Sequence, residues 1–107
     1  MSGSKAPDTI IIEERQNRRK DIMKIGFIGL GNMATAMIGG MLQKGIAAPE
    51  DIIGSARTET TVEKVKTKFN INTTTDNKIV AAQADILFLA VKPIFFPEVI
   101  DQIKDVV

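Results

Sequence analysis

The sequence predicts an α/β fold, in which helices flank a parallel β-sheet. Short apolar runs typical of buried strands alternate with stretches whose apolar residues recur at helical spacing. Strands that alternate with helices pair in parallel through right-handed crossovers. The first and last runs, 24–29 and 85–91, are almost wholly apolar, which indicates a sheet that is covered on both faces.

The first expected strand, 24–29, is followed by a helix that ends at Gly45. One face of this helix carries apolar residues at positions i, i+3, i+4, i+7 and i+8, namely Ala34, Met37, Ile38, Met41 and Leu42. A second short strand is expected at 51–55.

A second helix is expected from the helical spacing of Val62, Val65 and Phe69. Thr60 and Glu63 have the spacing of a capping box at its start. A weak third strand, 71–74, follows, and Asp76 or Asn77 can cap a short helix through Ile79, Val80 and Ala82.

The fourth expected strand, 85–91, is the clearest one in the sequence. Pro93 and Pro97 bracket a loop and the start of a last helix, whose apolar stripe is Val99, Ile100, Ile103 and Val107. Numbered from residue 24, the four strands should lie in the order 3-2-1-4 of a doubly wound, Rossmann-like sheet, which would be truncated before a fifth strand.

Composition excludes several kinds of site. The 107 residues leave room for one domain and contain neither Cys nor His. Disulfides, thiolate nucleophiles and structural zinc sites are therefore excluded, and no metal site is expected. Because the chain has 14 basic and 13 acidic residues, its net charge favours neither a nucleic acid nor a membrane as partner. No run is long enough to span a bilayer and no secretory segment is recognisable, so we expect a cytoplasmic protein.

Residues 1–22 differ from the rest of the chain. They hold one apolar run, Ile10 to Ile12, and a charged block without sustained periodicity, and Met23 stands directly before the first strong strand. We interpret 1–22 as a leader or tag that is disordered, and 23–107 as the N-terminal part of the Rossmann-like domain. The alternative is a short helix from Glu13 to Asp21 that docks on a partner.

The motif Gly29-Leu-Gly-Asn-Met-Ala34 has the form G-x-G-x-x-A and lies between a strand and a helix, which is the context of a dinucleotide-binding turn. Gly29 permits the tight turn, Gly31 lets a pyrophosphate approach the backbone, and Ala34 lets the helix pack closely. The helix N-terminus then offers N–H groups to the phosphates. A tight turn without a ligand is the alternative.

The end of the second strand bears on the choice of cofactor. An NAD site usually has an acidic residue about 20 residues past the fingerprint. Here Gly54 occupies that place, and no carboxylate occurs before Glu59. Ser55 and Thr58 can donate hydrogen bonds and Arg57 can pair with a 2′-phosphate, which favours NADPH over NADH. Alternatively, Arg57 is only a solvated loop residue.

Two segments resemble pyrroline-5-carboxylate reductases. They are Met23-Lys-Ile-Gly-Phe-Ile-Gly-Leu-Gly-Asn-Met-Ala34 and, after Asp76-Asn77, Ala84-Asp-Ile-Leu-Phe-Leu-Ala-Val-Lys-Pro93. The related β-hydroxyacid dehydrogenases share the Gly-Leu-Gly-Asn-Met start but usually lack Val-Lys-Pro. The resemblance covers 23–107 and implies an NADP-dependent oxidoreductase that transfers hydride to 1-pyrroline-5-carboxylate, which gives L-proline.

The resemblance also implies roles for single residues. The turn Gly29–Met33, with Ile28 before it, would hold the pyrophosphate; Ser55, Arg57 and Thr58 would lie near the 2′-phosphate. Asn77 would bond the adenosine-side ribose, and the end of the last strand would line the nicotinamide half. The full set is Ile28, Gly29, Leu30, Gly31, Asn32, Met33, Ser55, Arg57, Thr58, Asn77, Ala90, Val91, Lys92 and Pro93.

This family continues beyond the present chain into a helical domain that forms a homo-oligomer and supplies most substrate contacts. We therefore expect a cofactor half-site here, and assign no catalytic residue. The nucleotide domain of another NADP-linked reductase, such as an F420-linked one, or of a β-hydroxyacid dehydrogenase remains an alternative, as does a non-catalytic fragment or module. The apolar strand 85–91 would be an unprotected edge prone to self-association, unless Thr9 to Glu13 pairs with it.

Overall fold

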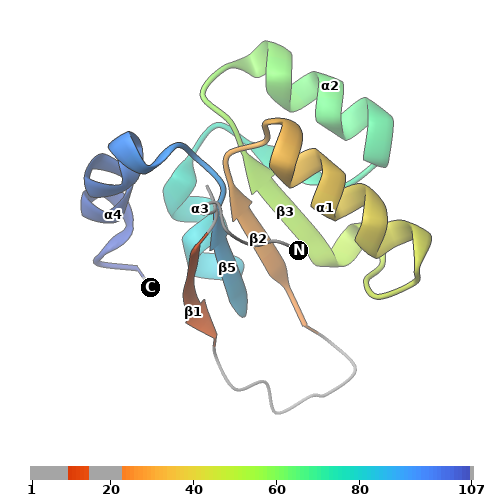
Figure 1. Ribbon diagram of the computed structural model, residues 1–107, viewed down its shortest axis with the longest axis horizontal. Helices are drawn as coiled ribbons and strands as arrows, with labels where there is room; N and C mark the ends of the chain where they lie inside the picture. Colours follow the sequence, from red (N-terminus) through yellow and green to blue (C-terminus); the bar gives the residue numbers. More distant parts are fainter. Residues whose placement is uncertain (1–9, 15–22, 107) are drawn as a thin grey trace, which may run out of the picture.

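The computed structural model in Figure 1 describes residues 10–14 and 23–106. Its strands are β1 (Ile10–Glu14), β2 (Ile25–Ile28), β3 (Ile52–Ser55), β4 (Asn72–Thr74) and β5 (Ile86–Leu89). Its α-helices are α1 (Asn32–Gln43), α2 (Glu59–Phe69), α3 (Asn77–Gln83) and α4 (Phe96–Ile103). Two short 3-10 helices, η1 (Pro49–Asp51) and η2 (Pro93–Phe95), precede β3 and α4.

The five strands form one sheet in the order β1-β5-β2-β3-β4. β2 pairs in parallel with both β3 and β5, so that Ile25 lies between Ile52 and Ile86. β3 pairs in parallel with β4. The predicted order 3-2-1-4 of four parallel strands is therefore confirmed as β4-β3-β2-β5, and the fold is Rossmann-like.

The strand β1 corrects two expectations from the sequence. It pairs antiparallel with β5, from Ile10 opposite Leu89 to Glu14 opposite Ile86, with an irregularity between Ile11 and Glu13. The disorder expected for 1–22 is thus wrong for 10–14, and the edge of β5 is covered. The alternative pairing by Thr9 to Glu13 is confirmed for 10–13. Residues 1–9 and 15–22 lie outside the described residues, as does most of the alternative helix.

Helices cover both faces of the sheet (Figure 1). On one face α1 and α2 pack over β2 and β3, with Phe27 and Ile38 fully buried between them. On the other face α3 and α4 pack over β2, β3 and β5 around Leu87 and Leu89. The two buried faces explain why the central strands β2 and β3 carry no exposed residue.

The ends of the helices follow the expected residue types, with one shift. Gly45 adopts a positive φ of 71° just after α1, and Asp76 accepts a hydrogen bond from the Lys78 N–H at the start of α3. The expected capping box at Thr60 and Glu63 is wrong. Thr58 caps α2 instead, because its hydroxyl oxygen accepts from the Thr61 N–H.

The apolar stripes of the last two helices were predicted only in part. Val80 in α3 and both Val99 and Ile103 in α4 are buried, whereas Ile79 and Ile100 are exposed. Ala81 rather than Ala82 completes the buried face of α3. Val107 lies outside the described residues.

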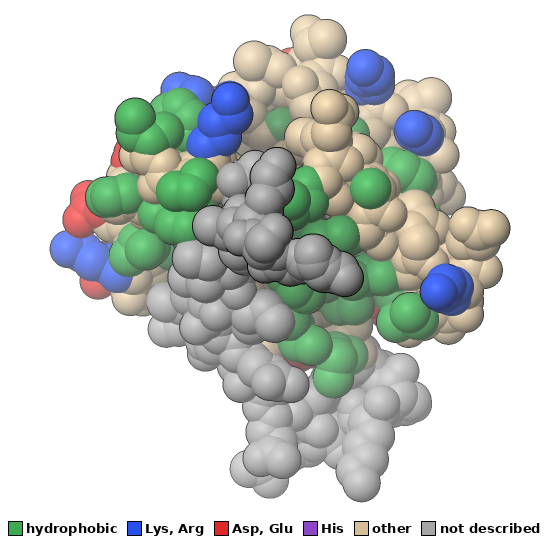
Figure 2. Space-filling view, in the orientation of Figure 1, with side chains coloured by type: hydrophobic (Ala, Val, Ile, Leu, Met, Phe, Trp, Pro, Cys, Tyr) green, Lys and Arg blue, Asp and Glu red, His purple; other side chains and the backbone are tan. Residues whose placement is uncertain are grey.

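Figure 2 shows how the charged and hydrophobic side chains of the described residues are distributed on one face of the molecule. The Lys and Arg side chains of the described residues lie apart around its rim, while hydrophobic side chains gather in the middle and over α4. No helix in the described part of the chain is both long enough and apolar enough to cross a bilayer.

Gly29 sets the close approach of two strand ends. Its φ of 106° lies in a region that L side chains rarely adopt. A Cβ at this position would collide with the backbone carbonyl oxygen of Ala90 and lie 2.8 Å from the Val91 side chain. The chain can therefore turn from β2 toward α1 beside the end of β5 only with glycine at this position.

We predict that Gly29→Ala lowers the free energy of unfolding by about 1–3 kcal/mol through backbone strain, before the collision with Ala90 is counted. Gly40→Ala is the matched control, because a Cβ there meets no atom within 4 Å and alanine favours the helix. The control should raise stability by about 0.5–1 kcal/mol. Urea denaturation measures both. Equal effects of the two substitutions on stability would contradict the requirement for glycine at position 29.

Candidate functional site

A groove of about 710 Å³ lies at the carboxyl edge of the parallel strands. The backbone joins the strand ends here: the Gly29 N–H donates to the Ser55 carbonyl at 2.9 Å, and the Ala90 N–H donates to the Ile28 carbonyl at 2.8 Å. In a doubly wound sheet this edge is the switch point, where successive connections leave for opposite faces and a crevice opens between them.

Twelve of the fourteen residues predicted from the sequence line this groove, and they come from four separate segments of the chain. They are Ile28, Gly29, Leu30, Gly31, Asn32, Ser55, Arg57, Thr58, Asn77, Ala90, Val91 and Lys92. Met33 and Pro93 do not line it. Met33 is exposed on the first turn of α1, and Pro93 begins η2.

The start of α1 faces the groove without a side-chain cap. Gly31 is the N-cap residue, no side chain accepts a hydrogen bond there, and the first turn holds no acidic residue. A Cβ on Gly31 would meet no atom within 4 Å, so the space beside it is open. Ala34, fully buried, lets the helix pack against the sheet. An uncapped helix start beside open space is a favourable place for an anion.

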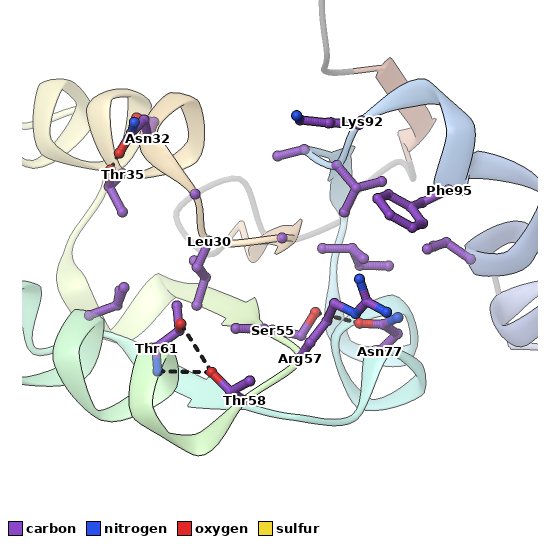
Figure 3. Close-up of a pocket in the computed structure, with 18 of the residues that line it drawn as sticks. Leu30, Asn32, Thr35, Ser55, Arg57, Thr58, Thr61, Asn77, Lys92 and Phe95 are labelled. Atoms are coloured by element: carbon purple, nitrogen blue, oxygen red, sulfur yellow. Dashed lines mark hydrogen bonds between the residues drawn. The ribbon is translucent and has the colours of Figure 1, made fainter.

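A chain of hydrogen bonds crosses the floor of the groove. The Ser55 hydroxyl, which is 0% exposed, donates to Asn77 Oδ1 at 2.7 Å, and Asn77 Nδ2 donates to Gln102 Oε1 at 2.7 Å. Figure 3 shows Ser55 and Asn77 joined in this way. Ser55 was expected to donate to a phosphate, whereas its hydroxyl hydrogen is directed to Asn77. This difference arises because burial obliges a hydroxyl to find a partner inside the protein.

Arg57 and Thr58 follow β3 and have different partners. The Thr58 hydroxyl donates to Thr61 Oγ1 at 3.1 Å while it caps α2, so it serves the helix. The exposed Arg57 side chain reaches across the groove, where its guanidinium carbon lies 5.0 Å from the centroid of the Phe95 ring. Glu59, the first carboxylate after β3, begins α2 and does not line the groove.

The groove is positively charged although the chain is nearly neutral. Four cationic side chains line it against the single carboxylate of Glu98; the four are Arg57, Lys64, Lys68 and Lys92. Lys64 and Lys68 were not predicted from the sequence as site residues, and neither were Thr61 and Val65 on the same face of α2. Their spacing of i, i+3, i+4 and i+7 is the signal that could have identified this face.

The arrangement is suited to binding and not to proton transfer. The groove offers backbone N–H groups at a helix start, cations and amide side chains, but Glu98 is the only carboxylate among the described residues that line it. In the described residues no three acidic side chains cluster as metal ligands. An extended, negatively charged ligand matches these properties.

We predict that Ser55→Ala lowers the free energy of unfolding by about 1–3 kcal/mol, because it removes the buried donor to Asn77. Thr67→Ala serves as the control, since Thr67 is exposed on α2 and its change should stay within about 0.5 kcal/mol. Thermal unfolding of the two variants measures the difference. If Ser55→Ala proved neutral, the buried hydrogen-bond chain would not contribute as described.

The sequence of the chain is similar to those of known reductases. The chain is 39% identical over 82 residues to a pyrroline-5-carboxylate reductase of Methanosarcina acetivorans, which covers 77% of this chain and 30% of the relative. It is also 39% identical over 82 residues to pyrroline-5-carboxylate reductase 2 of Bacillus subtilis, with 76% and 30% covered. The chain thus spans about 30% of the length of these relatives.

Solved structures agree with the sequence comparison. The structure of a pyrroline-5-carboxylate reductase from Coxiella burnetii superimposes with a TM-score of 0.73 at 36% identity, covering 78% of this chain and 30% of that one. Residues 24–107 match the profile of the family described as NADP oxidoreductase, coenzyme F420-dependent. The chain therefore belongs to this family of NADP oxidoreductases.

Proposed function

We propose that the groove binds a nicotinamide dinucleotide and that the chain is the cofactor-binding part of a reductase. The observation that carries the proposal is the uncapped start of α1, where Gly31 leaves open space beside a groove with four cationic side chains. A pyrophosphate is the group that such a helix start accommodates.

The residues present fit this cofactor. The turn from Gly29 to Asn32 would hold the pyrophosphate on backbone N–H groups. Asn77, whose amide accepts a hydrogen bond from Ser55 and lines the same groove, would bond the ribose on the adenosine side. The end of β5, from Ala90 to Lys92, would line the nicotinamide half. These are the roles that the family resemblance also implies.

The reaction proposed is the reduction of 1-pyrroline-5-carboxylate to L-proline. The similarity to pyrroline-5-carboxylate reductases over residues 24–107 supports it. When bound, NAD(P)H would supply the hydride, while the residues of this chain bind and orient the dinucleotide and supply no catalytic acid or base. Homo-oligomer formation and a cytoplasmic location stay predictions.

A second candidate follows from the family profile, whose description names coenzyme F420. In that case NADP would occupy the same groove, and the other hydride carrier would be a deazaflavin. The two candidates are separated with the full-length protein, by whether F420 or 1-pyrroline-5-carboxylate oxidises NADPH, because this chain spans about 30% of the relatives and is expected to hold only the cofactor half-site.

We predict that Gly31→Ala weakens NADPH binding at least about tenfold, because the new methyl group occupies the space assigned to the pyrophosphate. Gly40→Ala, whose Cβ also meets no atom but which lies outside the groove, should bind NADPH as the wild type does. Isothermal titration calorimetry measures both affinities. Undiminished binding by Gly31→Ala would exclude the pyrophosphate from this position.

We propose further that Arg57 makes NADPH the preferred cofactor, because no carboxylate lines the groove on the β3 side, where a ribose 2′-hydroxyl would be bound. Charged hydrogen bonds to a 2′-phosphate contribute about 1.5–3 kcal/mol. Arg57→Gln should therefore lower the affinity for NADPH relative to that for NADH by roughly tenfold or more. Arg57→Lys, which keeps the charge but loses the planar fork, should lie between. An unchanged NADPH-to-NADH ratio would contradict the role of Arg57.

A further inference from the structure

A glutamine on the last helix contacts a groove residue on the helix before it. Gln102 belongs to α4 and Asn77 is the first residue of α3, and Asn77 Nδ2 donates to Gln102 Oε1 at 2.7 Å. Figure 1 shows α3 and α4 on the same face of the sheet, where Val80 and Val99 belong to one core. Gln102 lies outside that core, is exposed and lines the groove. This hydrogen bond therefore connects α4 to the candidate site.

The amide group of Asn77 is held at both ends. Its Oδ1 accepts from the buried Ser55 hydroxyl at 2.7 Å, and its Nδ2 donates to Gln102. The terminal torsion of an asparagine is broad and roughly two-fold, so a single hydrogen bond leaves the amide plane free to turn. Ser55 determines where the oxygen lies, because a buried hydroxyl hydrogen needs an acceptor. Gln102 then fixes the nitrogen, and with it the plane of the amide.

The fixed amide keeps hydrogen-bonding capacity for a ligand. An amide side chain has two donor hydrogens and two acceptor lone pairs. Among the described residues, Ser55 occupies one lone pair and Gln102 accepts one hydrogen. The remaining donor and acceptor belong to a half-buried side chain that lines the groove. A ribose hydroxyl can accept from the one and donate to the other, provided that the amide keeps its orientation.

We propose that Gln102 is a positioning residue for the dinucleotide, an inference that rests on the proposed function. Gln102 would raise the affinity by holding the Asn77 amide in the orientation that bonds the adenosine-side ribose. Holding the side chain in advance reduces the conformational freedom that is lost when the ligand binds. Because Gln102 is exposed on α4, its substitution should change the stability of the fold little.

The test is a double-mutant cycle on NADPH affinity, measured by calorimetry with the 107-residue chain. Gln102→Met keeps the length of the side chain but removes the acceptor, and should weaken NADPH binding roughly threefold to tenfold. In the Asn77→Ala background the same change should have no effect, because the group that Gln102 positions is absent. Gln83→Met is the matched control: Gln83 is exposed at the end of α3 and lies outside the groove, so its change should not alter the affinity.

A measurement without ligand checks the orientation of the amide itself. In NMR spectra of the isotope-labelled chain, Gln102→Met should shift the side-chain amide signals of Asn77 and speed the exchange of their protons with solvent, whereas Gln83→Met should change neither. Both variants should unfold at about the temperature of the wild type, which separates positioning from a loss of structure. Unchanged Asn77 signals in Gln102→Met would overturn the proposal whatever the affinities.

The outcomes separate this inference from the proposed function. A wild-type chain that binds no NADPH contradicts the dinucleotide function, and the positioning role with it. A wild-type chain that binds NADPH, with Gln102→Met binding equally well, overturns only the role of Gln102. An equal loss of affinity in the wild-type and Asn77→Ala backgrounds also overturns it, because Gln102 would then act on the dinucleotide without Asn77.

Discussion

The close approach of Gly29 to the carbonyl oxygen of Ala90 is the constraint on which the site depends. Because no side chain stands between them, the backbone can turn out of β2 at a φ of 106° beside the end of β5. That turn places the N-terminus of α1 over the carboxyl edge of the sheet. Gly31 and Asn32 then line the groove, and the first N–H groups of α1, which have no acceptor within the helix, lie at this end of it.

Charge is distributed so that a nearly neutral chain carries a positive site. The cations of the groove come from separate segments: Arg57 follows β3, Lys64 and Lys68 lie on α2, and Lys92 follows β5. Their positions come from helical spacing and from the convergence of strand ends. Focusing of positive potential within a cleft favours an anionic ligand even where the net charge of the chain is small.

Much of this arrangement could be predicted from the sequence, because the strands are buried on both faces and the turn motif is local. The four parallel strands and their order followed from those patterns. β1 was predicted only as an alternative, since five residues show too little periodicity and their pairing with β5 is long-range. The cap of α2 was misplaced because Thr58 and Thr60 are chemically equivalent, so only backbone geometry selects Thr58. Phe95 was not predicted as a groove residue, because its position there depends on the short helix η2, which the sequence pattern did not indicate.

The proposed function requires that a dinucleotide binds with its pyrophosphate at the start of α1. Two-dimensional amide NMR of the isotope-labelled chain during titration with NADPH tests this most directly. The largest chemical-shift changes are expected at Gly29, Gly31 and Asn77, with little change at Gly45, which lies outside the groove. Chemical-shift changes that centre away from the carboxyl edge of the sheet, or none at saturating NADPH, would contradict binding of the pyrophosphate at the start of α1.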